Sequence, residues 1–190
     1  QETHNKKLFS HLRLNQDYND RLDKKYKAAK SGLLIEEGIL GGVGESLDDV
    51  VDSIEEMKKM DAHQVRVMNF IPQQGTPMQD FPSPPKQYEL LIIAVLRLLF
   101  PDRLIPASLD VYGIDGLKGK LEAGANVVTS LILPQSRMVG VAQSTLDINE
   151  GYRTVKGITP ILDELGLTKA EFGDYISWID NEKKLFSNTS

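Results

Sequence analysis

A regular alternation of helix and strand patterns between residues 15 and 133 constrains the fold of this chain most strongly. Segments in which apolar residues recur with helical spacing alternate with short apolar runs that are typical of strands. The predicted helices cover residues 15–29, 47–60, 86–99 and 115–123, and the predicted strands cover residues 33–40, 64–70, 104–109 and 125–133. Each unit is long enough for a crossover between parallel strands. The sequence therefore predicts an α/β fold, either a doubly wound sheet or a (β/α) barrel.

The pattern changes after Pro134. Residues 135–157 are polar and rich in loop-forming residues, and two helices are expected after them. These helices cover residues 158–165 and 168–180. Thr168 and Glu171 have the spacing of a capping box at the start of the second helix. We therefore expect one domain in two parts, an α/β part followed by a C-terminal loop and helical cap that closes over one end of the sheet. The two parts are residues 1–134 and residues 135–190.

The composition argues against several classes of function. The net charge is −5 at pH 7 and no basic block is present, so nucleic acid is not an expected partner. No apolar run reaches the length of a membrane span, and the polar N-terminus does not resemble a signal peptide. The chain has no cysteine, and its three histidines lack the spacing of a metal site. We expect a soluble cytoplasmic protein with no membrane partner.

A glycine-rich turn separates the strand at 33–40 from the helix at 47–60. Gly38, Gly41 and Gly42 lie in or next to this turn, and such residues let a ligand approach the backbone closely. Ser46 and Asp49 have the spacing of a helix cap. The N–H groups of such a turn could hold a nucleotide or another cofactor. An ordinary tight loop between strand and helix is the alternative.

Polar residues stand at the ends of three predicted strands, where parallel α/β folds carry their chemistry. Arg66 lies in an otherwise apolar strand, and Ser108 and Asp110 share a face at the end of the next. Thr129 and Ser130 interrupt the last strand. A buried arginine needs an anion, which would be Asp110 or the carboxylate of a ligand. Arg66 and Asp110 together would suit an amino acid, and an internal ion pair between them is the alternative.

Glu2 and Arg21 form a second possible pair. Glu2 lies at the end of an apparent first strand, and Arg21 lies on the helix that faces it after a loop. The two side chains could hold the ammonium and carboxylate groups of another amino-acid-like ligand. A glutamate and an arginine exposed to solvent are the alternative, because isolated surface pairs contribute little.

Several short motifs follow one another in an order that is specific to one enzyme family. They are Glu2-Thr3-His4-Asn5 with Arg13 and Arg21, Gly38–Ser46, Asn69-Phe70-Ile71-Pro72, Gly75-Thr76-Pro77, Arg97 with Pro101, Ile105-Pro106-Ala107-Ser108 and Ala123-Gly124-Ala125-Asn126. With these motifs the chain resembles the radical S-adenosylmethionine (SAM) barrel enzymes of the biotin-synthase-like group over nearly its whole length. The resemblance implies the C-terminal half of a TIM-type (β/α) barrel with a C-terminal helical cap.

The resemblance also implies which residues bind which ligand. SAM would be bound by Glu2, Arg13, Arg21, Gly38, Gly41 and Gly42. The substrate would be bound by Arg66, Ser108, Asp110, Thr129 and Ser130. No residue of this chain is expected to be a metal ligand.

Within the group, the resemblance is strongest to the enzymes that rearrange L-lysine to 3-methylornithine in pyrrolysine biosynthesis. It implies a monomeric radical isomerase that uses SAM and a [4Fe-4S] cluster and takes electrons from a reductant protein. The family's C-x3-C-x2-C cluster motif is absent, because the chain has no cysteine. The residues from Gln1 to Asn5 look like the tail of a strand. We therefore expect a C-terminal half of a longer protein, inactive by itself, whose cluster ligands lie outside this chain.

Three alternatives to this interpretation stay open. The chain could serve another biotin-synthase-like radical SAM enzyme, such as a hydrogenase maturase relative or biotin synthase. It could also be a cluster-free α/β module that binds a nucleotide or an amino acid. As a structural half-barrel that assembles only with another chain, it would expose strand edges and aggregate when expressed alone.

Overall fold

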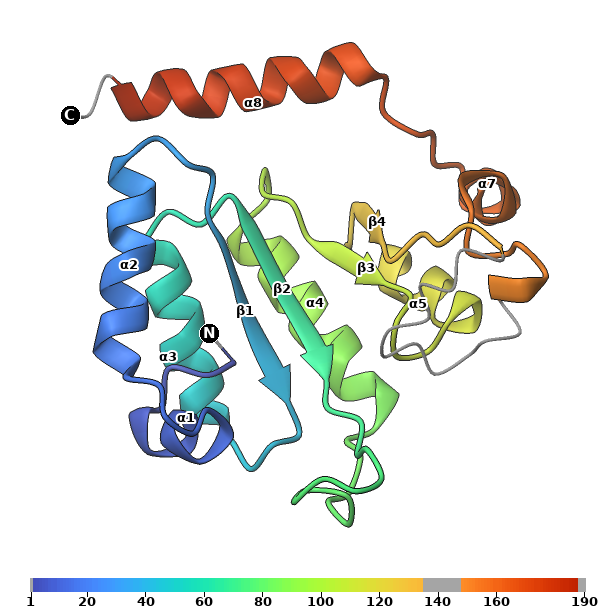
Figure 1. Ribbon diagram of the computed structural model, residues 1–190. Coiled ribbons are helices and arrows are strands. Elements are labelled where there is room, and N and C mark those ends of the chain that lie inside the picture. Colours follow the sequence, from blue (N-terminus) through green and yellow to red (C-terminus); the bar gives the residue numbers. More distant parts are fainter. Residues whose placement is uncertain (1, 135–147, 188–190) are drawn as a thin grey trace.

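The computed structural model describes residues 2–134 and 148–187, in which helices and short parallel strands alternate (Figure 1). The N-terminal elements are α1 (Lys6–Leu12), α2 (Tyr18–Lys30), β1 (Glu36–Gly41), α3 (Leu47–Lys59), β2 (Gln64–Asn69) and α4 (Lys86–Leu99). They are followed by β3 (Pro106–Ser108), η1 (Ile114–Gly116), α5 (Leu117–Glu122), β4 (Val127–Thr129), α7 (Val155–Glu164) and α8 (Phe172–Ser187). The predicted α/β alternation is confirmed.

The four strands form a curved parallel row in which their carboxyl ends share one edge. β1 pairs with β2 from Glu36↔Gln64 onward, and β3 pairs with β4 in the same direction. A parallel bridge between Gln64 and Leu104 joins the two pairs. At the other edge, the N–H of Leu40 donates to the carbonyl oxygen of Glu2 over 2.8 Å. The N-terminal segment therefore continues the row beyond β1, as expected for a strand tail.

Helices cover one face of this row and leave the other face open. Along β2, Val65 and Val67 are buried against the helices, whereas Arg66 and Met68 alternate with them and are half-buried. The helix side carries the core, in which α3 packs on β1 and α4 packs on β2 (Figure 1). A doubly wound sheet would need helices on both faces. Within the described ranges, the one-sided arrangement corresponds to the wall of a barrel.

Local sequence signals account for most of the element boundaries. α4 has the predicted bounds because Pro85 precedes it and Pro101 cannot continue it. α2 ends in a Schellman arrangement, in which the N–H of Leu33 donates to the carbonyl of Ala28 and Gly32 takes a φ of +78°. The predicted capping box between Ser46 and Asp49 is present at the start of α3. These signals are short-range, and sequence reasoning detects them well.

The predictions of local structure differ from the observed elements most at α1, β3, β4, α7 and α8. α1 was missed because it has only one buried residue, Phe9, and so shows no repeating apolar pattern. The strands at 104–109 and 125–133 are shorter, because only three residues of each pair in the sheet. α7 begins at Val155, earlier than expected, with Thr154 as its N-cap. α8 begins at Phe172, so the expected capping box at Thr168 does not start this helix.

α8 lies at the amino ends of the strands, opposite to the edge where the polar strand ends meet (Figure 1). Its Glu182 carboxylate accepts from Arg103 over 2.5 Å and lies 3.8 Å from the Nε2 atom of His63, which directly precedes β2. α7 contributes Ile158 to the core. Most of the loop predicted over 135–157 lies outside the described residues. None of the helices that the structure describes is long and apolar enough to cross a lipid bilayer.

Candidate functional site

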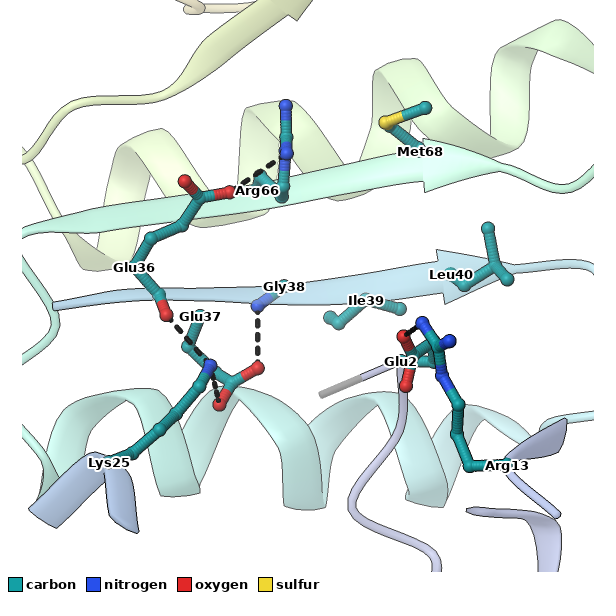
Figure 2. Close-up of a pocket in the computed structure, with 10 residues that line it drawn as sticks. All are labelled: Glu2, Arg13, Lys25, Glu36, Glu37, Gly38, Ile39, Leu40, Arg66 and Met68. Carbon is teal, nitrogen blue, oxygen red and sulfur yellow. Dashed lines mark hydrogen bonds and ion pairs between the residues drawn. The ribbon is translucent and has the colours of Figure 1, made fainter. Parts of the chain in front are cut away.

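A pocket of about 380 Å³ lies along β1 and β2 (Figure 2). This β1–β2 pocket is lined by strand residues together with Glu2, Arg13 and Lys25. Figure 2 shows the Glu2–Arg13 pair near Leu40 and the other arginine, Arg66, nearer the start of β1. Its volume lies in the range of small-molecule sites. Charged groups of both signs therefore face one cavity.

The carboxylate of Glu2 forms an ion pair with Arg13. Burial raises the pKa of Glu2, but the hydrogen bond and charge of Arg13 outweigh it, so the net shift is downward. The second carboxylate oxygen, Oε2, is buried and has no hydrogen-bond partner among the residues that the structure describes. Arg21 does not line the pocket: it donates to Gln16 over 2.7 Å. Of the two predicted arginines, Arg13 is thus the one that the structure brings to Glu2.

Arg66 finds its anion on the neighbouring strand. Its Nη1 atom lies 2.9 Å from Oε1 of Glu36, and both side chains are partly exposed. In the described ranges it makes no ion pair with Asp110, so the internal Arg66–Asp110 pair considered from the sequence is wrong. Gly38 lies beside Arg66 in the parallel register, and a Cβ there would come within 2.7 Å of its Cγ. Gly38 therefore lets the arginine side chain cross β1.

A second carboxylate at the pocket, Glu37, is held by groups on the helix side of β1. Lys25 lies 2.7 Å from its Oε2 atom, and the N–H of Gly38 donates to its Oε1 atom over 2.9 Å. Burial raises the pKa of Glu37, but His4 and Lys25 lower it by more. The net result is a pKa of about 2. Glu37 is therefore ionised and fully engaged with the fold.

In the glycine turn, residues 41–46, two backbone N–H groups bind a side chain of the turn itself. The N–H groups of Gly42 and Val43 donate to the Glu45 carboxylate over 2.7 and 2.8 Å, and the Tyr88 hydroxyl donates to the same group over 2.8 Å. A Cβ on Gly41 would lie 2.9 Å from Tyr88, and a Cβ on Gly42 would lie 2.5 Å from a proline ring of the loop before α4. Two of the N–H groups expected to hold a cofactor thus bind Glu45 instead, as in the ordinary-loop alternative.

The predicted polar residues at the ends of β3 and β4 do come together. The Ser130 hydroxyl donates to Oδ2 of Asp110 over 2.6 Å, and the Ser108 hydroxyl lies 3.4 Å from the same oxygen. Ser130 adopts a φ of +64°, an uncommon conformation for serine. Thr129 has a buried hydroxyl that finds no hydrogen-bond partner in the described part of the chain. β3 and β4 therefore end in a compact group of hydroxyls around one carboxylate.

Sequence reasoning missed Arg153, which completes this group. Its side chain is 0% exposed, and its Nη2 atom lies 2.9 Å from Oδ1 of Asp110. Burial raises the pKa of Asp110, but the hydrogen bonds from Ser130 and Arg153 lower it more. No periodicity or motif distinguished Arg153, because it follows a loop-rich segment. Ser108, Asp110, Ser130 and Arg153 are called the strand-end cluster below.

A buried lysine supports the strand-end cluster from the helix side. The Nζ atom of Lys120 donates to the carbonyl oxygen of Ser108 over 2.8 Å and lies 2.8 Å from the Glu89 carboxylate. Both Lys120 and Glu89 are almost completely buried. Lys120 lies on the short helix α5, and only the tertiary structure shows its role. Its ion pair fixes the end of β3.

The arrangement suits small zwitterionic ligands better than a metal ion. Within residues 2–134 and 148–187, no group of three or more potential ligands could hold a metal ion. The unpaired oxygen of Glu2 fits an ammonium group, and the arginines of the β1–β2 pocket fit carboxylates. The 190 residues of this chain include no cysteine, so the ligands of a cysteine-bound cluster would have to come from outside it.

Comparison with known proteins identifies relatives that agree with one another. The chain is 42% identical to the 3-methylornithine synthase of Methanosarcina barkeri over 175 residues, which cover 92% of this chain and 50% of that protein. It is 36% identical to the biotin synthase of Streptomyces coelicolor over 45% of this chain and 21% of that protein. A crystal structure of methylornithine synthase superposes on 93% of this chain and 52% of its own, with a TM-score of 0.85 and 41% identity. No model of a known protein family matches the chain.

The fold and these relatives define a homologue of the radical SAM barrel enzymes of the biotin-synthase-like group, as the motif order predicted. Within that group, the chain is homologous to methylornithine synthase. The predicted α/β half of a TIM-type barrel is confirmed by the superposition. The chain spans about half the length of the methylornithine synthases that it matches.

Proposed function

We propose that this chain serves a radical SAM mutase that converts L-lysine to 3-methylornithine in pyrrolysine biosynthesis. The observation that carries the proposal is the 42% identity to 3-methylornithine synthases over 92% of the chain. The charged groups of the β1–β2 pocket and of the strand-end cluster support it, because an amino-acid substrate and the methionine end of SAM are both zwitterions.

In this proposal the cofactors are SAM and a [4Fe-4S] cluster, which together supply the radical that removes a hydrogen atom from lysine. Glu2 takes the ammonium group of SAM through its unpaired buried oxygen, and Arg13 takes the carboxylate. Gly38 borders the same pocket without a side chain. Arg21, first paired with Glu2 from the sequence, becomes the weaker candidate, since it lies beyond the pocket lining. Gly41 and Gly42 are not assigned to SAM, because they pack against α4 and the loop before it.

The substrate is held between the strand ends. Asp110 accepts a hydrogen bond from an ammonium group of lysine, and Ser108 and Ser130 orient its carboxylate. Arg66 binds the substrate carboxylate in exchange for part of its pairing with Glu36. Thr129 offers a hydroxyl that has no other partner in the described residues. The lowered pKa of Asp110, caused by the hydrogen bonds from Ser130 and Arg153, keeps this carboxylate charged for the contact.

Two substitutions test the substrate assignment in the full, reconstituted protein. Asp110→Ala and Arg66→Ala should each lower lysine conversion at least about 100-fold, because each removes a charged hydrogen bond to the substrate in the proposal. SAM affinity should stay within about twofold, since neither residue holds SAM in the proposal. Asp174→Ala, on an exposed turn of α8, is the matched control. Unchanged lysine conversion in either test variant would contradict the assignment.

Product analysis separates this activity from those of other biotin-synthase-like enzymes. With isotopically labelled L-lysine, mass spectrometry should detect 3-methylornithine, and only when SAM and a reductant are supplied. The isolated 190-residue chain should give no product, since it has no cysteine to hold a cluster. Tight binding of lysine and SAM by that isolated chain, together with no iron-dependent activity of the full protein, would instead favour a binding module. We also expect a monomer that works in the cytoplasm with an electron-donating protein.

A further inference from the structure

Arg153 reaches the strand-end cluster from a segment that lies outside the parallel row. Its backbone carbonyl accepts a hydrogen bond of 2.8 Å from the N–H of Ile132, which fastens this segment to the chain just after β4. The side chain then turns inward and donates to Oδ1 of Asp110. The contact therefore joins the segment before α7 to the carboxyl end of β3.

The bonding of Arg153 differs from that of an arginine with a packing role. Arg97 shows the latter, since its guanidinium donates to four backbone carbonyls, those of Gly124, Phe100, Pro101 and Arg103. Arg153 is fully buried, but its Nε and Nη1 atoms have no hydrogen-bond partner among the described residues. Within the described part of the chain, its side chain thus makes one polar contact, which is to Asp110. A guanidinium buried at such cost is explained by what it does to Asp110.

The contact also helps to fix the orientation of the Asp110 carboxylate. Arg153 bonds Oδ1, while Ser130 and Ser108 approach Oδ2, so the carboxylate is fixed in one orientation from both sides. Behind Ser108, Lys120 is paired with its own Glu89. Among the described residues, Arg153 is the cation that forms an ion pair with Asp110.

We propose that Arg153 is a positioning residue, which holds Asp110 in the orientation that receives the ammonium group of an amino-acid substrate. The substrate part of this inference rests on the proposed function. Arg153 does not need to touch the substrate, because it acts through the carboxylate that does. It therefore adds a site component from outside the strands, where no motif pointed.

The test combines two measurements on the full protein with the variants Arg153→Gln and Arg153→Lys, and with Arg97→Gln as the structural control. Carbon-13 NMR of labelled aspartate measures the pKa of Asp110, and steady-state kinetics measures KM and kcat for lysine. We expect Arg153→Gln to raise the Asp110 pKa and to raise the lysine KM roughly tenfold, with a smaller change in kcat. Arg153→Lys should recover part of both effects. Arg97→Gln should lower the melting temperature without moving either quantity.

The result that overturns the proposal is an Asp110 pKa and a lysine KM in Arg153→Gln that match those of Arg97→Gln. If Arg153→Gln fails to fold, the same comparison is made with Arg153→Lys, whose shorter donor should still raise the lysine KM. Failure of the proposed function gives a different result, since wild-type protein would then not convert lysine. The pKa measurement still decides the contact between Arg153 and Asp110 in that case, because it needs no turnover.

Discussion

The glycine turn and the strand-end cluster both lie where parallel strands end, but they differ in how their polar groups are satisfied. In the turn, Glu45 accepts from the N–H groups of Gly42 and Val43, and Ser46 and Asp49 cap α3 reciprocally. In and beside the strand-end cluster, buried atoms of Thr129 and Arg153 lack partners within the described ranges. Both regions were candidate ligand sites from the sequence, and in the turn the N–H groups of Gly42 and Val43 already bind Glu45.

A glycine-rich turn therefore has to be judged by the groups that its backbone amides already bind. A buried polar group without a partner is costly, so its persistence points to a water or a ligand. Amides that already bind a side chain, such as those bonded to Glu45, contribute to the stability of the fold. The predictions below use this comparison, because substitutions in the turn should cost stability only, whereas substitutions in the cluster should also affect ligands.

The largest stability effect is expected for Asp110→Ala. It leaves the fully buried Arg153 without its counter-charge, and breaking a buried pair in this way costs about 3–5 kcal/mol of unfolding free energy. Urea denaturation of the full protein measures the loss. The double variant Asp110→Ala/Arg153→Met should lose less than the single variant, because it removes both charges. A double variant that is less stable than Asp110→Ala would show that this pair does not explain the loss.

Gly42→Ala should cost about 2–4 kcal/mol, from a positive φ of +86° and a close contact with the proline ring of Pro84. The matched control is Gly44→Ala, which has a φ of +102° but open space around its Cβ. It should lose only the backbone part, about 1–2 kcal/mol. Equal losses in the two variants would rule out the packing explanation. Neither substitution should change SAM affinity, and a loss of SAM binding in Gly42→Ala would show that the turn does contact the cofactor.

Glu45→Gln should destabilise the fold by about 1–3 kcal/mol, because one backbone N–H of the turn loses a carboxylate acceptor in a partly buried site. Thermal unfolding measures this change. Glu55→Gln is the control, since that glutamate is exposed on α3. If lysine or SAM affinity rose in Glu45→Gln, the freed amides would be ligand donors after all.

The smallest effects concern the stability of the two regions in acid. The pKa of Asp110 is below its ordinary value although burial raises it, because Ser130 and Arg153 lower it more, and the pKa of Asp49 is low through the backbone hydrogen bond from Ser46. Each carboxylate therefore stabilises the folded state above about pH 4 and loses this contribution as the pH falls through the folded pKa. The pH dependence of the urea midpoint between pH 5 and pH 2 should become flatter in Asp110→Asn than in Asp49→Asn, because Asp110 pairs with a fully buried arginine. Equal flattening would contradict the contrast.

The parts of the fold that the sequence could predict are those fixed by neighbours along the chain. The bounds of α4 follow from two prolines and an apolar period, and the cap of α3 follows from Ser46 and Asp49. α1 carries only one buried residue, so its seven residues offered no period to detect. Local chemistry thus defines the elements.

The site could be predicted only in part, because its partners come from distant segments. Asp110, Ser108 and Ser130 were found because strand ends can be located from the sequence. The anion beside Arg66 is Glu36 on the neighbouring strand, which depends on register. Arg153 comes from a segment with no regular pattern, so its contact with Asp110 follows only from the tertiary structure.

The most direct test is a crystal structure of the full protein, grown without oxygen in the presence of SAM and L-lysine but without a reductant. The account predicts a lysine ammonium group within hydrogen-bond distance of Asp110, the methionine end of SAM at Glu2 and Arg13, and Glu45 still bound to the amides of the glycine turn. Either ligand on the amides of Gly42 and Val43, with Glu45 displaced and Asp110 in contact only with protein, would contradict it.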